Sequence, residues 1–246
     1  TSTDFGEDRL FSIENVYGSN DSSVRDRIYG DDQDNKIYGQ AGNDILEGGA
    51  GADIIDGGEG SDYASYIRSS EGVNINLKTN VNTGGDAQGD LLYSIEYIRG
   101  SNYADNITGS DSNDNIIGES GMDIIKGGDG NDRIRGREDN DTLTGGSGSD
   151  DFIFELAGAL TSVDTITDFN LAEGDTIDIV DILTGYDALT SAITDYVQIT
   201  DNGTDSFVAV DVDGGADNFV QIAVLSGVTG LNDEDQLETN GALITV

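Results

Sequence analysis

The chain places a short carboxylate or amide side chain at every ninth position in two separate runs. The runs consist of Asp26, Asn35, Asp44, Asp53 and Asp62, and of Asp105, Asp114, Asp123, Asp132, Asp141 and Asp150. Such a row of oxygen donors suits a hard cation, because Ca²⁺ takes about six to eight oxygen ligands. Zinc and most transition metals would lack their usual ligands, since the sequence has no His and no Cys. The pattern therefore predicts calcium binding.

Each of these positions belongs to a nine-residue unit with fixed residue types. A branched apolar residue follows two positions later and Gly follows four positions later, as in Asp44, Leu46 and Gly48. Gly permits the positive φ of a sharp turn, and side chains alternate across a short strand, so only the apolar residue faces inward. A strict period of this kind defines a repeat architecture. We expect one turn and one strand per unit, and two units, or 18 residues, per coil.

Residues 18 apart would stack on the same side of such a coil, for example Asp26 on Asp44 and Asp105 on Asp123. Neighbouring strands lie about 4.8 Å apart, and bare carboxylates at that spacing repel each other. A shared Ca²⁺, completed by backbone carbonyls, would reverse the repulsion. The formal net charge of −38, from 49 acidic and 11 basic residues, also opposes compaction unless cations bind. It argues against nucleic acid and anionic membrane surfaces as partners.

The two runs divide the chain into expected parts. Two related segments, 10–20 and 94–102, each contain Ser-Ile-Glu and precede a run, so each is either a cap for its block or an ordinary connecting strand. Asp86 and Asp90 lie between the runs in a turn-rich loop, where a solvated loop is favoured over a cation site. No apolar run reaches about 18 residues, so no transmembrane helix is expected, and no N-terminal signal peptide is evident.

The repeat, written Gly-Gly-x-Gly-x-Asp-x-U-x with U large and apolar, resembles the calcium-binding nonapeptide of the RTX (repeats-in-toxin) family. Good copies begin at Gly48, Gly57, Gly127 and Gly145. The resemblance implies an all-β fold with two parallel β-roll (β-solenoid) blocks, capping strands and a C-terminal β domain. The implied parts are 1–25 (N-terminal capping segment), 26–66 (first β-roll), 67–104 (β insertion and second capping segment), 105–156 (second β-roll) and 157–246 (C-terminal β domain with a type I secretion signal).

In that family the Asp side chains and the carbonyls of the Gly-rich turns hold calcium, so the resemblance implies two kinds of ligand here. The side-chain ligands are the residues of the two runs. The implied carbonyl ligands are those of Gly39, Ala41, Gly48, Ala50, Gly57, Glu59, Gly109, Asp111, Gly118, Ser120, Gly127, Asp129, Gly136, Glu138, Gly145 and Ser147. Turns 30–35 and 136–141 lack the second and fourth Gly, which predicts distorted, weaker or empty sites there. Asn35 supplies no charge.

Residues 157–246 resemble the C-terminal region of type I secretion substrates, notably large bacterial RTX adhesins. The matching stretches are 164–169, 174–179 and 242–246. The resemblance implies an uncleaved C-terminal export signal, which would account for the missing N-terminal one. We therefore expect a calcium-dependent folding and secretion module of an exported adhesin, extracellular and held at the cell surface by the rest of its parent. The expected partners are several structural calcium ions and the type I secretion apparatus, with no membrane insertion and a monomeric state.

Other functions remain open at this point. The absence of His excludes a zinc-protease motif and a Ser-His-Asp triad, although paired carboxylates of the glycosidase type stay possible. A non-enzyme is favoured, and the alternative is the non-catalytic RTX module of a secreted protease, lipase or polysaccharide epimerase. Direct glycan or surface binding is a third possibility, since Tyr29, Tyr38, Tyr63 and Tyr66 could stack on sugars. Tyr is also ordinary on a strand surface.

Overall fold

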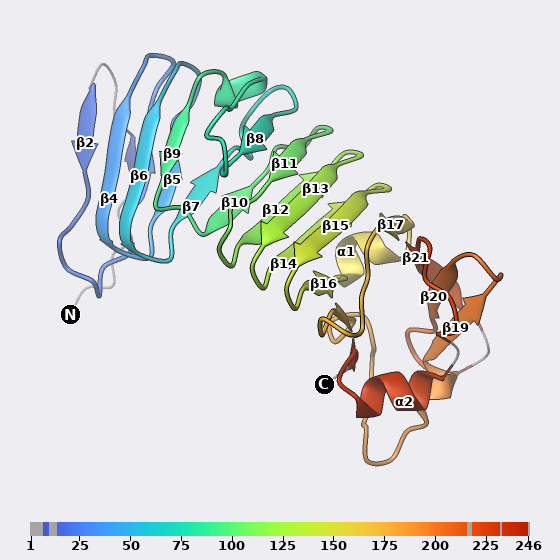
Figure 1. Ribbon diagram of the computed structural model, residues 1–246. Coiled ribbons are helices and arrows are strands. Elements are labelled where there is room, and N and C mark those ends of the chain that lie inside the picture. The colour runs from blue at the N-terminus through green and yellow to red at the C-terminus, as the bar shows by residue number, and fades with distance from the viewer. Residues whose placement is uncertain (1–6, 10–13, 216–217, 232, 246) are drawn as a thin grey trace.

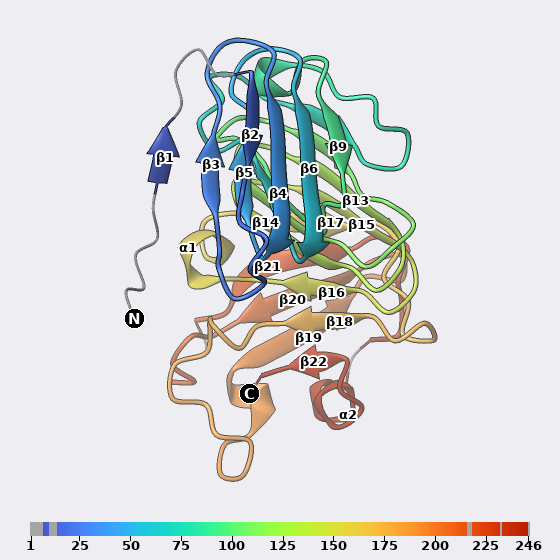
Figure 2. The same cartoon turned by 90° about the vertical axis from the view of Figure 1, so that its left-hand side faces the viewer.

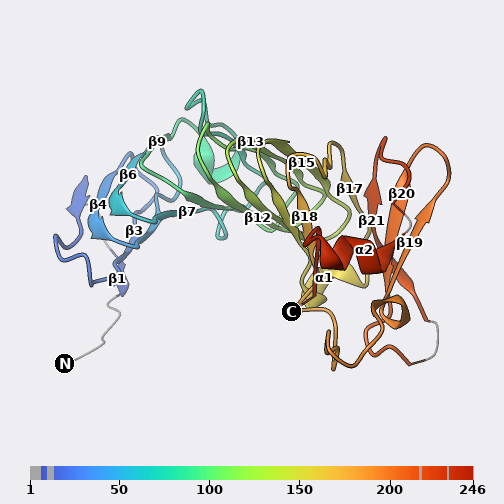
Figure 3. The same cartoon turned by 60° about the horizontal axis from the view of Figure 1, so that its bottom comes forward.

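The computed structural model describes residues 7–9, 14–215, 218–231 and 233–245, and it is a long β-roll followed by a smaller C-terminal part (Figure 1). Successive short strands alternate between two faces, so that each pair of strands makes one coil. Figure 2 looks along the coils from the end that holds β1 (Glu7–Arg9), and Figure 3 shows them following one another along the molecule. The fold is almost entirely β, as predicted. Most of the predicted 1–25 cap is described, but residues 1–6 and 10–13 lie outside the described residues.

One face is a single ten-stranded sheet that runs through the whole roll. All of its strand pairs are parallel. Its strands, in spatial order, are β1, β3 (Arg27–Tyr29), β5 (Ile45–Glu47), β7 (Tyr63–Ser65), β10 (Tyr97–Arg99), β12 (Asn115–Ser120), β14 (Arg133–Glu138), β16 (Asp151–Ile153), β18 (Thr176–Asp178) and β22 (Leu243–Ile244).

The other face consists of two sheets. The first contains β2 (Asn15–Tyr17), β4 (Lys36–Gly42), β6 (Ile54–Gly60) and β9 (Leu91–Tyr93). The second contains β8 (Asn74–Asn76), β11 (Asn106–Thr108), β13 (Ile124–Asp129), β15 (Thr142–Ser147), β17 (Asp164–Ile166), β21 (Val220–Leu225), β20 (Ser206–Val210) and β19 (Val197–Asp201). The face is therefore interrupted between β9 and β8, where the insertion enters.

Within the blocks the strand register confirms the predicted 18-residue coil. Ile107 pairs with Ile125, which pairs with Leu143, and on the opposite face Ile116 pairs with Ile134. The central residue of each strand points into the roll and is buried, while its neighbours point outward. The apolar stack on the inside contains Ile28, Ile37, Leu46, Ile55, Ile107, Ile116, Ile125, Ile134 and Leu143. One apolar residue per nine is thus enough to build a continuous core.

The insertion joins the two blocks into one roll. Tyr97 of β10, in the second capping segment, pairs directly with Tyr63 of β7. The inserted residues 67–93 therefore add no strand to the ten-stranded sheet. The inserted chain supplies β8, a short 3₁₀ turn at Gly85–Ala87, and β9, which completes the first block by pairing with β6. Asp90 precedes β9 and is only 1 % exposed. The interpretation of Asp90 as part of a solvated loop is therefore wrong.

The C-terminal part begins as a continuation of the roll. β17 pairs with β15, and β16 pairs with β18, so both faces extend beyond residue 156. A helix at Leu156–Ala159 (α1), a 3₁₀ turn at Ile193–Asp195, the antiparallel hairpin β19–β20 and a helix at Glu234–Thr239 (α2) complete it. The hairpin turns at Asn202-Gly203, and the division of the chain at residue 157 stays a prediction. In the described part of the chain, no helix is long and apolar enough to cross a membrane.

Candidate metal-binding turns

The turns that follow the strands form two stacks along the edges of the roll. Stack A follows the strands of the interrupted face and contains turns 18–26, 39–44, 57–62, 109–114, 127–132 and 145–150. Stack B follows the ten-stranded sheet and contains turns 30–35, 48–53, 100–105, 118–123 and 136–141. Each turn starts with Gly and ends with one of the residues predicted to bind calcium. The structure therefore brings these residues together in the predicted two rows.

In seven of the stacked carboxylates, one oxygen accepts a backbone N–H of the preceding coil. Oδ1 of Asp44 accepts the backbone N–H of Asp26 at 2.8 Å, and Oδ1 of Asp132 accepts that of Asp114 at the same distance. The bond recurs between residues 18 apart at Asp53, Asp62, Asp123, Asp141 and Asp150, over 2.7–2.9 Å. A carboxylate at this position thus fastens its own coil to the preceding one.

The second carboxylate oxygen divides the turns into two classes. In seven turns, which we call open turns, Oδ2 is buried and has no hydrogen-bond partner among the described residues. The seven residues concerned are Asp44, Asp53, Asp62, Asp123, Asp132, Asp141 and Asp150. A buried acceptor without a donor is costly, and a buried charge is normally paired or bound to a metal. These atoms therefore require a positive partner or a proton.

In the other four turns, which we call closed turns, the same oxygen is already satisfied from within the turn. The N–H of Ser19 donates to Asp26, that of Ser101 to Asp105 and that of Ser110 to Asp114, at 2.6–2.7 Å. In turn 30–35 the N–H of Asp31 donates to the amide oxygen of Asn35 at 2.8 Å. The first coil of each block therefore consists of closed turns on both sides.

Backbone conformation explains the two classes. In every open turn the second and fourth residues have positive φ, for example 93° at Gly49 and 125° at Gly51. The described residues of the closed turns have no positive φ, so the second N–H turns back toward the carboxylate. Arg137 and Asp139 adopt φ of 80° and 74° although neither is Gly. The distortion predicted for turn 136–141 is therefore absent, whereas turn 30–35 does depart from the open form.

The first Gly of a turn, in closed turns such as 109–114 as well as in open ones, leaves a space lined by oxygen atoms. A Cβ on Gly39 would lie 2.5 Å from Oδ2 of Asp44 and 2.5 Å from the carbonyl oxygen of Gly57 in the next coil. The same pairing surrounds Gly118 and Gly127, where the next-coil carbonyls belong to Gly136 and Gly145. Carboxylate and carbonyl oxygens are the ligands that Ca²⁺ prefers. The donor set and the missing side chain both fit such an ion.

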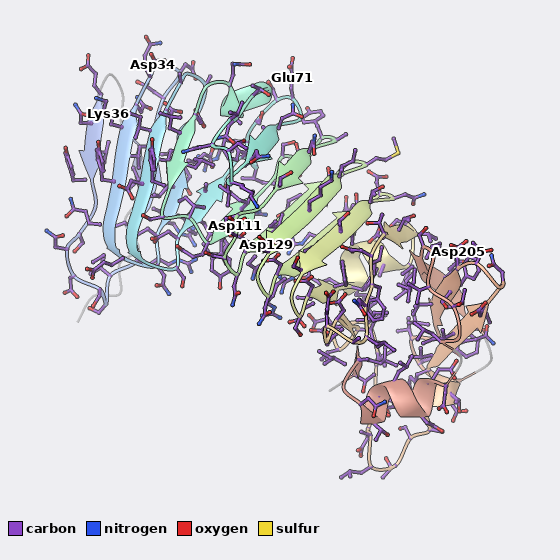
Figure 4. The ribbon with its side chains drawn as sticks, in the orientation of Figure 1. Asp34, Lys36, Glu71, Asp111, Asp129 and Asp205 are labelled. Atoms are coloured by element: carbon purple, nitrogen blue, oxygen red, sulfur yellow. The ribbon has the colours of Figure 1, made fainter. Side chains whose placement is uncertain are left out.

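The other predicted carbonyl donors lie in strand extensions or on the outer side of the turns. Third-position residues pair between coils, as Ala41 does with Glu59, and the remaining pairs are Ser120 with Glu138 and Asp129 with Ser147. The side chains of Asp111 and Asp129 face outward (Figure 4), where the ammonium nitrogen of Lys78 lies 2.5 Å and 3.7 Å from their carboxylates. Only the main chain of these two residues could then serve an ion inside the turn.

Burial gives the open-turn carboxylates unusual proton affinities. Loss of water, followed by repulsion from neighbouring carboxylates, raises the pKa of Asp53, Asp123 and Asp141 to about 8. The same causes raise the pKa of Asp132 to about 7 and that of Asp44 to about 6. Among the described residues no three acidic side chains gather around one point. The electrostatic potential at each open turn is therefore negative, and it comes from a carboxylate together with main-chain carbonyl oxygens.

Four acidic residues outside the nine-residue runs continue the same ladder. Asp90 accepts the N–H of Asp53 at 2.8 Å, and Glu96 accepts that of Asp62 at 2.9 Å. Asp164 and Asp175 accept the N–H groups of Asp141 and Asp150 at 3.0 and 3.1 Å. Each stands two residues before a buried apolar side chain: Leu92, Ile98, Ile166 or Ile177. That local spacing is the sequence signal that could have identified them.

The family model of the RTX calcium-binding nonapeptide repeat, in four copies, matches residues 25–64, 94–125 and 117–152. Both blocks are matched by this family model, and the matched residues make up less than half of the chain. Their cofactor is calcium, as predicted, and such repeats are calcium-binding rather than catalytic modules, typical of secreted proteins. Which atoms of the RTX turns hold the ion stays a prediction.

Two solved structures are similar to the chain, one over about half of its length and one over nearly all of it. One is the AlgE6R3 subunit of the Azotobacter vinelandii mannuronan C5-epimerase, with 26 % identity over 51 % of this chain and 70 % of that one, and a TM-score of 0.35. The other is the extracellular lipase LipA of Serratia marcescens, with 17 % identity over 99 % of this chain and a TM-score of 0.29. The chain spans 42 % of the length of the lipase. No curated protein sequence matches it.

Proposed function

We propose that this chain is a calcium-dependent folding module of a secreted protein, in which the open turns take the ions. The observation that carries the proposal is the set of seven buried Oδ2 atoms without a hydrogen-bond partner. A bound Ca²⁺ would supply the positive charge that these carboxylates lack. The turns themselves would supply the carbonyl oxygens and hold the carboxylates one coil apart.

The closed turns have a different proposed role. Asp26, Asn35, Asp105 and Asp114 are predicted ligands by spacing, but their side-chain oxygens already accept hydrogen bonds from their own turns. We assign these residues to holding the first coil of each block without an ion. The set of predicted side-chain ligands is then limited to the seven Asp residues of the open turns.

The energy scale makes folding depend on the compartment. Extracellular calcium modules bind at roughly 10⁻⁴–10⁻³ M, so cytosolic calcium is far too low to fill them. At free calcium 100-fold above the dissociation constant, each independent site adds about 2.7 kcal/mol to stability. The stabilisation from several such sites together is comparable to the about 5–15 kcal/mol by which a typical domain is stable. The chain would stay open before export and close outside.

More specifically, we propose that the chain is part of an adhesin and is exported by a type I secretion apparatus. The proposal is supported by the resemblance of residues 157–246 to the C-terminal regions of such proteins, at 164–169, 174–179 and 242–246. Export can be measured in cells that carry a type I exporter, by comparing the full chain with a variant lacking residues 242–246. We expect the full chain in the medium and the variant in the cells. Equal export of both would remove the C-terminal signal from the proposal.

Calcium-dependent folding is tested by circular dichroism of the full chain. The β-sheet signal should be weak in metal-stripped buffer and should rise steeply with calcium up to the millimolar range. Magnesium at equal concentration is the matched control, and it should have little effect because it demands a smaller, octahedral site. A full β-sheet signal without metal, unchanged by millimolar calcium, would refute the proposal.

A further inference from the structure

The Ser94-Ile95-Glu96 segment connects β9 to β10 and lies against the last open turn of the first block, 57–62. Glu96 accepts the backbone N–H of Asp62 through Oε2 at 2.9 Å. In the regular coils this bond is made by the Asp of the following coil, as Asp62 itself does for Asp44 at 2.7 Å. Glu96 therefore takes the place of the next repeat Asp.

Ser94 takes the place of the next repeat Gly. A Cβ on Gly57 would overlap both the carbonyl oxygen of Ser94 and Oδ2 of Asp62. The same two kinds of atom surround Gly39, where the carbonyl belongs to Gly57. Ser94 has φ of 50°, a left-handed conformation that is uncommon for Ser. That strained turn is what directs its carbonyl toward the first block.

The space between these groups is negative and lacks a donor. Asp62 is 0 % exposed, and its Oδ2 has no hydrogen-bond partner in the described part of the chain. Glu96 supplies the second carboxylate that the next repeat Asp supplies in a regular open turn, so the negative charge around the space is kept where the repeat ends. A buried oxygen of this kind, aimed at a carbonyl and next to a second carboxylate, calls for a cation.

Resting on the proposed function, we propose that Ser94 and Glu96, which lie outside the repeats, complete the calcium site of turn 57–62. The protein ligands are Oδ2 of Asp62, the carbonyl of Ser94 and the carboxylate of Glu96. The site fastens the end of the insertion to the first block at the point where the repeat pattern stops. Calcium would then join the two blocks as well as stabilise each of them.

The other side of the same coil ends in a different residue, although Oδ2 of Asp53 there also has no hydrogen-bond partner in the described part of the chain. Asp90 stands at the corresponding place in stack B, and its Oδ1 accepts the N–H of Asp53. Its Oδ2 accepts the hydroxyl of Tyr66, which is 1 % exposed, at 2.9 Å. A neutral hydroxyl thus satisfies the second oxygen of Asp90, whereas the bond that Glu96 makes at the junction is the one to the N–H of Asp62.

The test compares Glu96→Gln with Glu71→Gln in the full chain. Both changes remove one negative charge from the insertion region, but the side chain of Glu71 is exposed (Figure 4), and its backbone carbonyl accepts the hydroxyl of Ser69 and not a group of turn 57–62. Equilibrium dialysis should show one calcium fewer in Glu96→Gln, or a loss of at least tenfold in the affinity of one site. Glu71→Gln should match the parent. An unchanged number and affinity in Glu96→Gln overturns the inference.

A second measurement does not depend on how a variant folds. Crystals of the parent chain grown in calcium should show anomalous scattering from an ion between Asp62, Ser94 and Glu96. An ion at turn 39–44 with none at this place would overturn the inference and leave the proposed function standing. A parent chain that binds no calcium in dialysis would overturn both.

Discussion

Asp132→Asn and Asp114→Asn make a matched pair that separates open from closed turns. The two residues lie one coil apart in stack A, and both are buried. Oδ2 of Asp132 has no partner, whereas Oδ2 of Asp114 accepts the N–H and the hydroxyl of Ser110 at 2.6 and 2.9 Å. The substitution is the same in both cases, so any difference reports on the second oxygen.

The expected magnitudes follow from what each amide can still do. An Asn at 132 keeps an oxygen for the N–H of Asp114, but it turns an NH₂ group toward the carbonyl of Gly145 in place of the ligand. Loss of one ion at free calcium 100-fold above its dissociation constant costs about 2.7 kcal/mol. An Asn at 114 can keep both bonds to Ser110, and weakening them from charged to neutral costs about 1 kcal/mol.

The assay is urea unfolding at saturating calcium, followed by circular dichroism, with the β-sheet signal in metal-stripped buffer as the reference and calcium counted by equilibrium dialysis. Asp132→Asn should bind at least one calcium fewer than the parent, and its loss of stability should appear only with calcium present. Asp114→Asn should keep the number of bound ions of the parent. If Asp114→Asn loses an ion, or Asp132→Asn loses none, the division into open and closed turns is wrong.

Three further predictions concern protons, the junction and the turn backbone. In metal-free buffer the β-sheet signal should rise as pH falls from about 8 to 5. The pKa of Asp53 is raised to about 8 in the folded chain and is about 3.9 in an unfolded one, so protonation of this carboxylate favours folding. A signal that does not change with pH would contradict this prediction. Tyr66→Phe leaves Oδ2 of Asp90 without its donor, so the free energy of unfolding, measured with urea, should fall by about 1–3 kcal/mol. The number of bound ions should not change, and loss of an ion would show that calcium is held at Asp90. Gly127→Ala would place a Cβ on Oδ2 of Asp132, so its calcium midpoint should rise, and an unchanged midpoint would place the ion elsewhere.

The coil period and the inward apolar residues could be predicted from the sequence because both depend on local spacing alone. A strand of three residues buries its middle side chain whatever the turn does, and Ile107, Ile125 and Leu143 stack as expected. Apart from turn 30–35, whose departure its missing Gly residues predicted, the class of a turn was not predicted, because the interval of 18 is common to open and closed turns. Ser101 and Ser110, whose hydroxyls also bond to Asp105 and Asp114, show that Ser at the second position is an available signal.

The ladder residues outside the runs were missed for a different reason. Strand register, and not chain length, decides which residues meet. The bonded partners are 37 residues apart at Asp90, 34 at Glu96, 23 at Asp164 and 25 at Asp175. A rule based on a fixed interval fails once a loop is inserted between two strands that still pair. The short acidic-x-apolar pattern survives because the strand itself needs it.

The geometry of a single open turn also bears on how steeply folding should follow calcium. Oδ1 of Asp44 is bound to the backbone of the preceding coil, at Asp26. Its Oδ2 faces the carbonyl of Gly57 in the following coil. Each side chain therefore needs both neighbouring coils in place before its site is complete. A nearest-neighbour dependence of this kind is the basis of cooperativity in repeat proteins, so the open turns of a block should fill together and not one by one. The closed turns at the start of each block then provide a coil whose carboxylates are already satisfied, on which the calcium-dependent coils can stack.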